Sequence, residues 1–148
     1  MQIKYTIKQS TIPDAGKGLF TEQFIAKGTV VWKEDWDNLV IYTRKGLDKW
    51  LASLPYEQAC EYALHIHRYP ILGSDRCVYE LDESHYMNHS EGAMANIGSR
   101  NHDCYALRDI QPGEELLCNY NEFDDADWVQ VYKDKYKVWG PHLTKSKL

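Results

Sequence analysis

The chain has 148 residues, of which 43% are hydrophobic and 26% charged, a composition typical of a single globular domain. The formal net charge of −5 argues against a protein that grips nucleic acid through its phosphates, and it favours a basic protein or peptide as the partner. No apolar run approaches the ~18 residues of a membrane span, so no contact with a membrane is expected.

The first forty residues are predicted to be rich in β-structure. The segment IKYTIKQ (3–9) alternates, as a half-buried strand does. In TEQFIAKGTVVW (21–32), the residues AKG form a turn between two apolar, β-prone runs. A small helical insertion is then predicted at about 44–70, because apolar side chains share one helical face over 47–54 and a second stripe of period 3.6 covers 56–67.

Strand structure is predicted to return at CVYEL (77–81). The polar segment NHSEGAMANIGSRNHD (88–103) is expected to be a loop or an irregular strand. The next segment, CYALRDIQPGEELLCNY (104–120), is expected to form strand, turn and strand, with Pro112–Gly113 in the middle of a type II turn. No internal repeat is evident. An aromatic stripe in the tail predicts a C-terminal helix over about 124–139 that docks on the core.

Several familiar kinds of site are disfavoured by the residues. Ser90 directly follows His89, so in an extended segment the two side chains point to opposite faces and cannot pair as nucleophile and base. His65 and His67 are two residues apart on a predicted helix and point away from each other, so no metal site is predicted. The segment DAGKGLF (14–20) lacks the GxxxxGK[ST] pattern of a phosphate loop, but its glycines allow close approach of the backbone to a flat or charged group.

Three motifs nevertheless occur in one order: DAGKGLF near the N-terminus, YMNHS at 86–90, and ALRDIQPGEELLCNY at 106–120 before the aromatic tail. Together, with a helical insertion between the first two, they resemble the SET-domain family of S-adenosylmethionine-dependent protein-lysine methyltransferases over about residues 4–128. The resemblance implies a mainly β fold with a small helical insertion and a C-terminal helix, in which several small twisted sheets surround a knot-like core. It also implies a single SET-type domain over 1–148, of the compact kind without cysteine-rich flanking segments.

The resemblance assigns functional residues as well. Tyr120 would be the catalytic tyrosine, whose hydroxyl orients the lysine amine or the transferring methyl group. The cofactor S-adenosyl-L-methionine would lie along the backbone of the first motif, contact the second motif with its amino-acid end and adenine, and have its adenine ring covered from the tail. The cofactor-binding residues would then be Gly16, Lys17, Gly18, Leu19, Tyr86, Asn88, His89, Phe123 and Trp128.

The sequence departs from the family pattern in three places. The Pro-Asn pair that usually follows the NHS run closely is replaced by EGAMAN, which displaces Asn96. His85–Tyr86 stands where an Arg-Phe pair is common, and Asn119 replaces the aspartate common before the final tyrosine. These departures bear on the identity of the substrate more than on the fold.

The expected substrate is a basic protein or peptide, such as a histone or another lysine-rich protein, and no direct contact with nucleic acid is expected. The acidic run Glu122, Asp124, Asp125 and Asp127 could attract it, although charges at a helix start explain the run equally well. A homodimer is left open. Four well-separated cysteines and the absence of a signal peptide in MQIKYTIKQS predict reduced thiols in a cytoplasmic or nuclear protein, not a secreted one. Two alternatives stay open: a non-catalytic SET-fold module that binds a peptide or cofactor, and a metal- or cysteine-dependent hydrolase.

Overall fold

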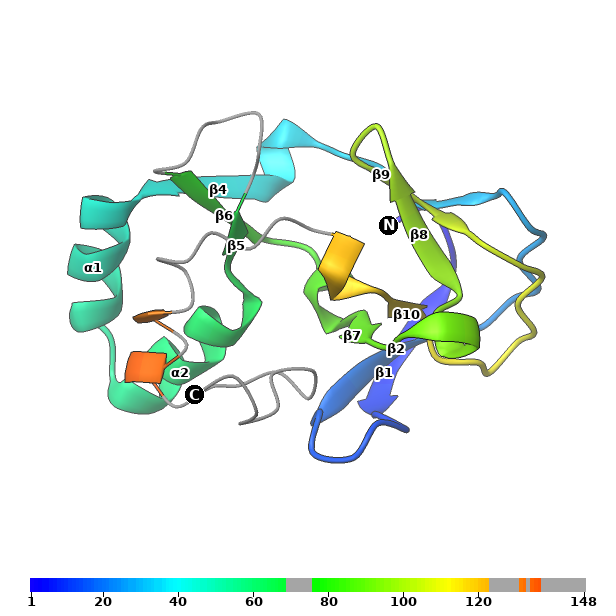
Figure 1. The fold of residues 1–148 in the computed structure, drawn as a ribbon, viewed down its shortest axis with the longest axis horizontal. Coiled ribbons are helices and arrows are strands. Elements are labelled where there is room, and N and C mark those ends of the chain that lie inside the picture. Colours follow the sequence, from blue (N-terminus) through cyan, green and yellow to red (C-terminus); the bar gives the residue numbers. More distant parts are fainter. Residues whose placement is uncertain (69–75, 123–130, 133, 137–148) are drawn as a thin grey trace. The chain divides into compact units, whose positions relative to one another are not determined.

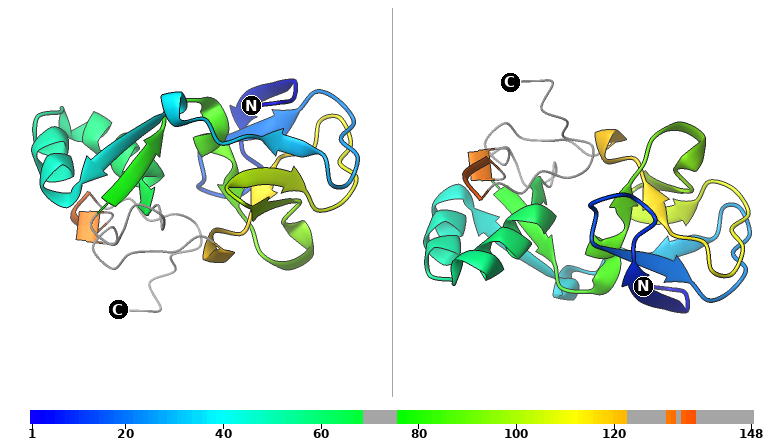
Figure 2. Two further views of the ribbon diagram at one scale, coloured as in Figure 1. Left: turned by 90° about the horizontal axis from the view of Figure 1, so that it is seen from above. Right: turned by 90° about the horizontal axis from the view of Figure 1, so that it is seen from below.

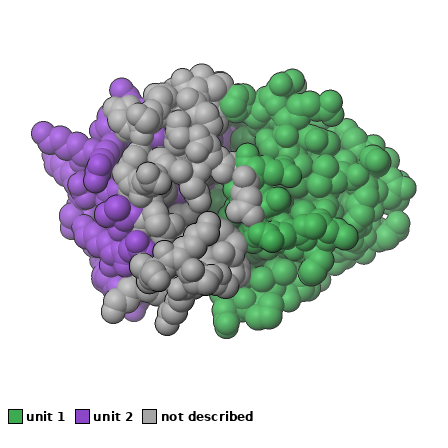
Figure 3. Space-filling model, viewed as in Figure 1, with its two compact units in different colours: residues 1–36, 82–122 green, residues 37–81, 123–148 purple. Residues whose placement is uncertain are grey.

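A computed structural model describes residues 1–68, 76–122, 131, 132 and 134–136 (Figure 1). The chain divides into two compact units, which Figure 3 colours separately. Unit 1 comprises Met1–Trp36 and Asp82–Glu122, and unit 2 comprises Asp37–Leu81 and Phe123–Leu148. Residues 37–81 of unit 2 are therefore inserted in the sequence between the two parts of unit 1. The single domain over 1–148 stays a prediction. Within the described ranges, no helix is long and apolar enough to cross a membrane.

Unit 1 is built from a two-stranded and a five-stranded sheet. The first pairs β1 (Tyr5–Gln9) with β2 (Lys17–Thr21) in antiparallel register. The second has the order β3-β9-β8-β10-β7, with strands Val30–Trp32, Asp103–Ala106, Ile97–Arg100, Leu117–Cys118 and Asn88–His89. Short 3-10 helices precede β7, lie between β7 and β8, and follow β10: η3 (Glu83–Tyr86), η4 (Gly92–Met94) and η5 (Tyr120–Glu122).

The knot-like core of the resemblance is found in the five-stranded sheet. Strand β10 lies between β7 and β8 and runs parallel to both (Figure 1). Cys118 is paired with His89 on one side and with Ile97 on the other. A late segment of the chain is thus inserted between two strands that precede it in the sequence. The predicted mainly β fold with several small sheets and a knot-like core is confirmed.

Both predicted turns are present, and each contains a glycine with a positive φ. In the first, the Thr29 N–H donates to the Ala26 carbonyl at 3.1 Å, and Gly28 has φ 83°. In the second, the Glu114 N–H donates to Gln111 at 3.1 Å, and Gly113 has φ 88°. A type II turn requires a positive φ at its third residue, which glycine adopts without steric cost.

The two turns belong to a repeat that the sequence does not reveal. We call residues 21–29 and 106–114 the two arms. At their centre, Ile25 and Ile110 each donate a backbone hydrogen bond of 2.9 Å to the other. The Gly113 N–H donates to Thr21 and the Thr21 N–H to Glu114, while the Gly28 N–H donates to Ala106 and the Ala106 N–H to Thr29. Each of these hydrogen bonds has a counterpart in which both residues are replaced by those 85 positions away in the other arm. The two arms are therefore paired with each other about a local pseudo-twofold axis.

The segment 88–103, expected to be a loop or an irregular strand, is more regular than predicted. It contains β7, η4 and β8, and β8 forms a hairpin with β9 in which Arg100 faces Asp103. The two residues between them, Asn101 and His102, have φ 52° and 68°. Positive φ at both central residues is the signature of a type I′ turn, whose twist matches that of paired strands.

Unit 2 contains two helices and a three-stranded antiparallel sheet of order β4-β6-β5, which Figure 2 shows in cyan to green. The strands are β4 (Leu39–Thr43), β6 (Arg76–Glu80) and β5 (His67–Arg68), and η1 (Trp36–Asn38) precedes them. The helices are α1 (Arg44–Ala52) and α2 (Tyr56–His65). Both lie within the predicted helical insertion, but α2 ends at His65. The prediction that His67 is helical is wrong, because its backbone pairs with β6.

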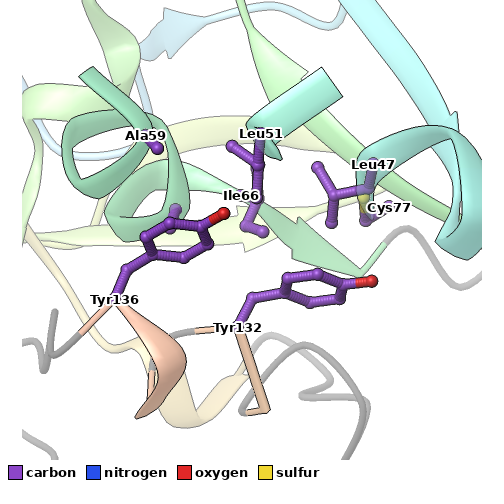
Figure 4. Packing of buried hydrophobic residues seen from close by; sticks show 8 residues of the cluster. Leu47, Leu51, Ala59, Ile66, Cys77, Tyr132 and Tyr136 are labelled. Atoms are coloured by element: carbon purple, nitrogen blue, oxygen red, sulfur yellow. The ribbon is translucent and has the colours of Figure 1, made fainter. Parts of the chain in front are cut away.

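One buried cluster holds unit 2 together (Figure 4). Its members come from both helices, from the residue after α2, from β6 and from the tail: Leu47, Leu51, Ala59, Ala63, Ile66, Cys77, Tyr132 and Tyr136. Tyr132 and Tyr136 belong to the predicted aromatic stripe, and Val131, Tyr132, Asp134 and Lys135 are helical. The predicted stripe consists of Trp128, Tyr132, Tyr136 and Trp139, and the second and third of these pack in a buried core, as predicted. Most of the predicted helix 124–139 lies outside the described residues.

Candidate functional site

The first two motifs are adjacent in unit 1. Lys17 lies on β2 and Asn88 on β7, and the Asn88 Nδ2 donates to the Lys17 carbonyl at 2.8 Å. The Lys17 ammonium lies 5.6 Å from the centroid of the Tyr86 ring, a cation–π arrangement. Gly16, with φ 71°, leads the chain into β2. The structure thus brings together four of the residues that the resemblance assigns to the cofactor.

Gly18 makes the close backbone approach that the glycines suggested. A Cβ atom at this position would lie 2.1 Å from Oε1 of Glu115 and 3.2 Å from Nδ2 of Asn88, so any other residue would have to displace the carboxylate. The charged group that approaches the backbone here is a carboxylate of this same chain. The neighbouring Leu19 side chain is fully buried, and its carbonyl accepts a hydrogen bond from the Leu116 N–H at 2.8 Å, which leaves little of Leu19 for a ligand.

Sequence reasoning missed Glu115, which is only 6% exposed. Its Oε1 accepts hydrogen bonds from Ser10 Oγ at 2.7 Å and from Asn88 Nδ2 at 3.0 Å. Its Oε2 accepts from the Thr11 N–H at 2.7 Å and also from the Thr11 hydroxyl. One carboxylate therefore joins three segments: the one after β1, strand β2 at Gly18, and β7. A glycine inside an apolar strand pattern was the available signal, since it often marks a close approach.

The hydrogen bonds decide the charge of Glu115. Burial raises the pKa of this carboxyl, but the hydrogen bonds from Thr11, Ser10 and Asn88 outweigh it, and the pKa lies below the ordinary value. Hydrogen bonds donated to a carboxylate favour its ionised form. Glu115 is therefore an anion at neutral pH.

His89 and Tyr120 are in direct contact. The Tyr120 N–H donates to Nδ1 of His89 at 3.0 Å, and the ring centroids are 5.3 Å apart. Burial lowers the pKa of His89, although Glu91, 3.7 Å from Nε2, acts in the opposite direction. A neutral imidazole whose Nδ1 accepts must carry its proton on Nε2. His89 is thus a neutral ring that accepts a hydrogen bond from the backbone of Tyr120.

The side chain of Tyr120 is fixed at its other end. Its hydroxyl donates to the carbonyl of Met87 at 2.7 Å. Since a hydroxyl has one donor and two lone pairs, the oxygen keeps the capacity to accept. The second motif therefore holds Tyr120 both at its backbone, through His89, and at its hydroxyl, through Met87.

Asn96 helps to close the knot despite the extra residues before it. These residues include η4, and Asn96 itself is only 1% exposed. Its Nδ2 donates to the Glu115 carbonyl, and its Oδ1 accepts from the Leu117 N–H, both at 2.8 Å. The amide thus satisfies two buried backbone groups where the chain threads towards Tyr120.

The model of the SET domain matches residues 16–121, which include the second and third motifs and the first motif from Gly16 onwards. The chain belongs to the SET-domain family. No curated protein sequence matches this SET domain. Among solved structures, it is similar to a chain of the polycomb repressive complex 2 of Chaetomium thermophilum bound to S-adenosylmethionine, with TM-score 0.61 and 20% identity over 91% of this chain and 17% of that one. A Plasmodium falciparum candidate histone methyltransferase matches with TM-score 0.51 and 20% identity, over 81% of this chain and 95% of that one.

These likenesses establish the fold, and this SET domain spans less than a fifth of the polycomb chain. Two of the predicted cofactor residues, Phe123 and Trp128, lie outside the described residues. Within the part of the chain that is described, no group of three or more His, Cys, Asp or Glu side chains could hold a metal ion. None of the four cysteines, all within the described residues, forms a disulfide.

Proposed function

We propose that this chain is an S-adenosylmethionine-dependent protein-lysine N-methyltransferase. Membership of the SET-domain family supports methyl transfer in general. The observation that carries the finer proposal is the position of Tyr120, which is held by His89 and Met87 of the second motif at the end of the threaded strand. The tyrosine hydroxyl thereby stands beside the residues assigned to the cofactor.

The proposed cofactor site fits the residues that are present. Asn88 is half-buried, and its Nδ2 faces three acceptors, so its Oδ1 faces away from them. In the described part of the chain, no donor bonds to this oxygen, which can therefore accept from a ligand N–H. The polycomb structure bound to S-adenosylmethionine supports the choice of cofactor by likeness of fold.

The cofactor supplies a methyl group that is activated by a positively charged sulfur. The task of the protein is then mainly alignment, which is worth up to ~7–11 kcal/mol in favourable geometry. Because the Tyr120 hydroxyl donates its proton to Met87, its oxygen can accept from a substrate amine and direct the nitrogen lone pair. No ionisation of Tyr120 is required, and neutral His89 keeps the backbone of Tyr120 in place.

The proposed substrate is a basic protein, such as a histone. The net charge of −5 favours such a partner, and exposed Glu91 and Glu122 flank His89 and Tyr120 in the sequence. The solved relatives include a polycomb complex with a histone H3 peptide, which supports this class by likeness of fold. A protein with this substrate would act in the cytoplasm or the nucleus.

Tyr120→Phe tests the proposal. The purified protein is incubated with labelled cofactor and histones, and labelled lysines are located by mass spectrometry. We expect the variant to lose on the order of 30- to 1000-fold in rate, because it lacks one preorganised group of the transition state. Its affinity for S-adenosylhomocysteine should stay within about twofold, since the ring and its packing are retained.

Tyr5→Phe is the matched control. Tyr5 also donates a 2.7 Å hydrogen bond, to Glu83, so the variant deletes an equivalent hydroxyl away from the site and should keep the wild-type rate. Near-normal turnover in a folded Tyr120→Phe protein would remove Tyr120 from the mechanism. A wild-type protein that binds the cofactor but labels no lysine would instead be a non-catalytic binding module.

A further inference from the structure

The Glu115 carboxylate is held by hydrogen bonds from neutral groups and not by a cation of the described residues. Its four hydrogen-bond donors are two hydroxyls, one backbone N–H and one amide, all neutral. No Lys, Arg or His of the described ranges forms a salt bridge with it. These neutral donors stabilise the ionised form but do not neutralise its charge, so the region around Glu115 keeps a negative potential that favours a cationic ligand.

The anion also determines how the Asn88 amide is turned. A carboxylate and the Lys17 carbonyl can only accept, so the atom of Asn88 that faces both of them must be Nδ2. Ser10 Oγ adds a third acceptor at 3.1 Å and itself donates to Glu115. The orientation of Asn88 therefore follows from its neighbours, and the amide oxygen is left on the opposite side.

We propose that Glu115 is a positioning residue that adapts the cofactor site to a cation: it turns the Asn88 oxygen towards the ligand, and its negative charge favours the sulfonium form of the cofactor over the neutral thioether. The inference rests on the proposed function, because the cofactor is the one proposed there. Gly18 has a part in it, since a side chain at that position would displace the carboxylate.

This arrangement has a consequence for turnover. S-adenosylmethionine carries one positive charge more than S-adenosylhomocysteine, and the two are otherwise nearly identical in shape. An anion near the site therefore makes S-adenosylmethionine bind more tightly relative to the product S-adenosylhomocysteine, which favours release of the product. We expect this preference to be on the order of tenfold, or about 1.4 kcal/mol.

The test is titration calorimetry with both cofactors on wild type, Glu115→Gln and Glu114→Gln. Glu114→Gln is the matched control, because it removes the same charge from the adjacent residue, whose carboxylate pairs with Arg108 at 2.7 Å instead. We expect Glu115→Gln to lower the affinity for S-adenosylmethionine by roughly tenfold more than it lowers the affinity for S-adenosylhomocysteine. Glu114→Gln should change both affinities by less than about twofold. An unchanged ratio of the two affinities in Glu115→Gln would overturn the charge part of the proposal.

A double-mutant cycle tests the positioning part. With S-adenosylhomocysteine as ligand, the losses caused by Glu115→Gln and Asn88→Ala should be clearly less than additive, because the first acts through the second. Additive losses would overturn this part. If Glu115→Gln does not melt cooperatively, Ser10→Ala takes its place in the cycle, since Ser10 contacts both residues. A wild-type protein that binds neither cofactor would refute the proposed function itself, whereas failure of the variants alone refutes only this inference.

Discussion

Substitution of Gly18 by alanine is the sharpest structural test of the Glu115 contact. The new Cβ would lie 2.1 Å from Oε1 and 2.8 Å from Cδ of Glu115. Because a non-bonded contact of this kind needs more than 3 Å, the carboxylate must retreat by about 1 Å. Bonds of 2.7 Å from Thr11 and 3.0 Å from Asn88 would then be stretched beyond a useful length.

The expected loss follows from these distances. Overpacking costs about 1–3 kcal/mol, and weakened hydrogen bonds to a charged group add about 1.5–3 kcal/mol, so Gly18→Ala should lower the free energy of unfolding by about 2.5–6 kcal/mol. For a chain of 148 residues this corresponds to a melting temperature roughly 5–25 °C lower. The affinity for S-adenosylhomocysteine should fall as well, because Asn88 loses its fixed partner.

Gly16→Ala separates this contact from backbone strain. Gly16 has φ 71°, but a Cβ added there would meet nothing within 4 Å, so alanine should cost roughly 1 kcal/mol of conformational strain and leave Glu115 in place. Thermal melting and calorimetry on both variants distinguish the cases. The reasoning is refuted if Gly18→Ala melts within about 1 °C of wild type, or if it is no more harmful than Gly16→Ala.

Three further outcomes are expected. Asn96→Ala should lower the free energy of unfolding by about 2–5 kcal/mol in urea titrations, because two buried backbone groups lose their partner; a loss below about 1 kcal/mol would contradict this. His102→Gly should raise the urea midpoint by the equivalent of about 0.5–1 kcal/mol, since glycine suits its φ of 68°, and a lowered midpoint would show that the His102 side chain matters more. Glu115→Gln should be less stable than wild type above pH 4.5. The folded pKa of Glu115 is depressed, so the stability that its ionised form contributes is complete above that pH and is lost as the pH falls through the folded pKa. If the difference in free energy of unfolding between wild type and Glu115→Gln stays constant on acidification, Glu115 is not ionised in the folded protein.

The sequence predicted those features that depend on neighbouring residues. The turns at Gly28 and Gly113 follow from a glycine at the position that needs a positive φ, and α1 follows from apolar residues at helical spacing. Strand β8 was not foreseen as a regular strand, because Gly98 and Ser99 have little intrinsic preference for one. Its conformation comes from pairing with β9 and β10, which local sequence does not record.

The site shows the same division. The resemblance singled out Asn88, His89 and Tyr120; the structure brings His89 and Tyr120 into contact and pairs Asn88 with Leu117 of β10. Glu115 was missed because Ser10 and Thr11, which bond its carboxylate, lie 105 and 104 residues away. Adjacent glutamates in GEELLCNY look alike in the sequence, yet one is a half-exposed partner of an arginine and the other is buried.

The paired arms impose an order on how the protein can be made. Ile25 leaves the ribosome 85 residues before Ile110, which holds its only backbone partner among these bonds. At a synthesis rate of about 5–20 residues per second, the first arm waits roughly 4–17 s with its hydrogen-bonding edge open to water and to other chains. The first stretch of unit 2, Asp37–Leu81, is made during that interval, but Tyr132 and Tyr136 of its buried cluster follow only after Ile110. A nascent-chain chaperone that covers residues 21–29 would therefore protect a strand edge that the newly made chain cannot yet pair.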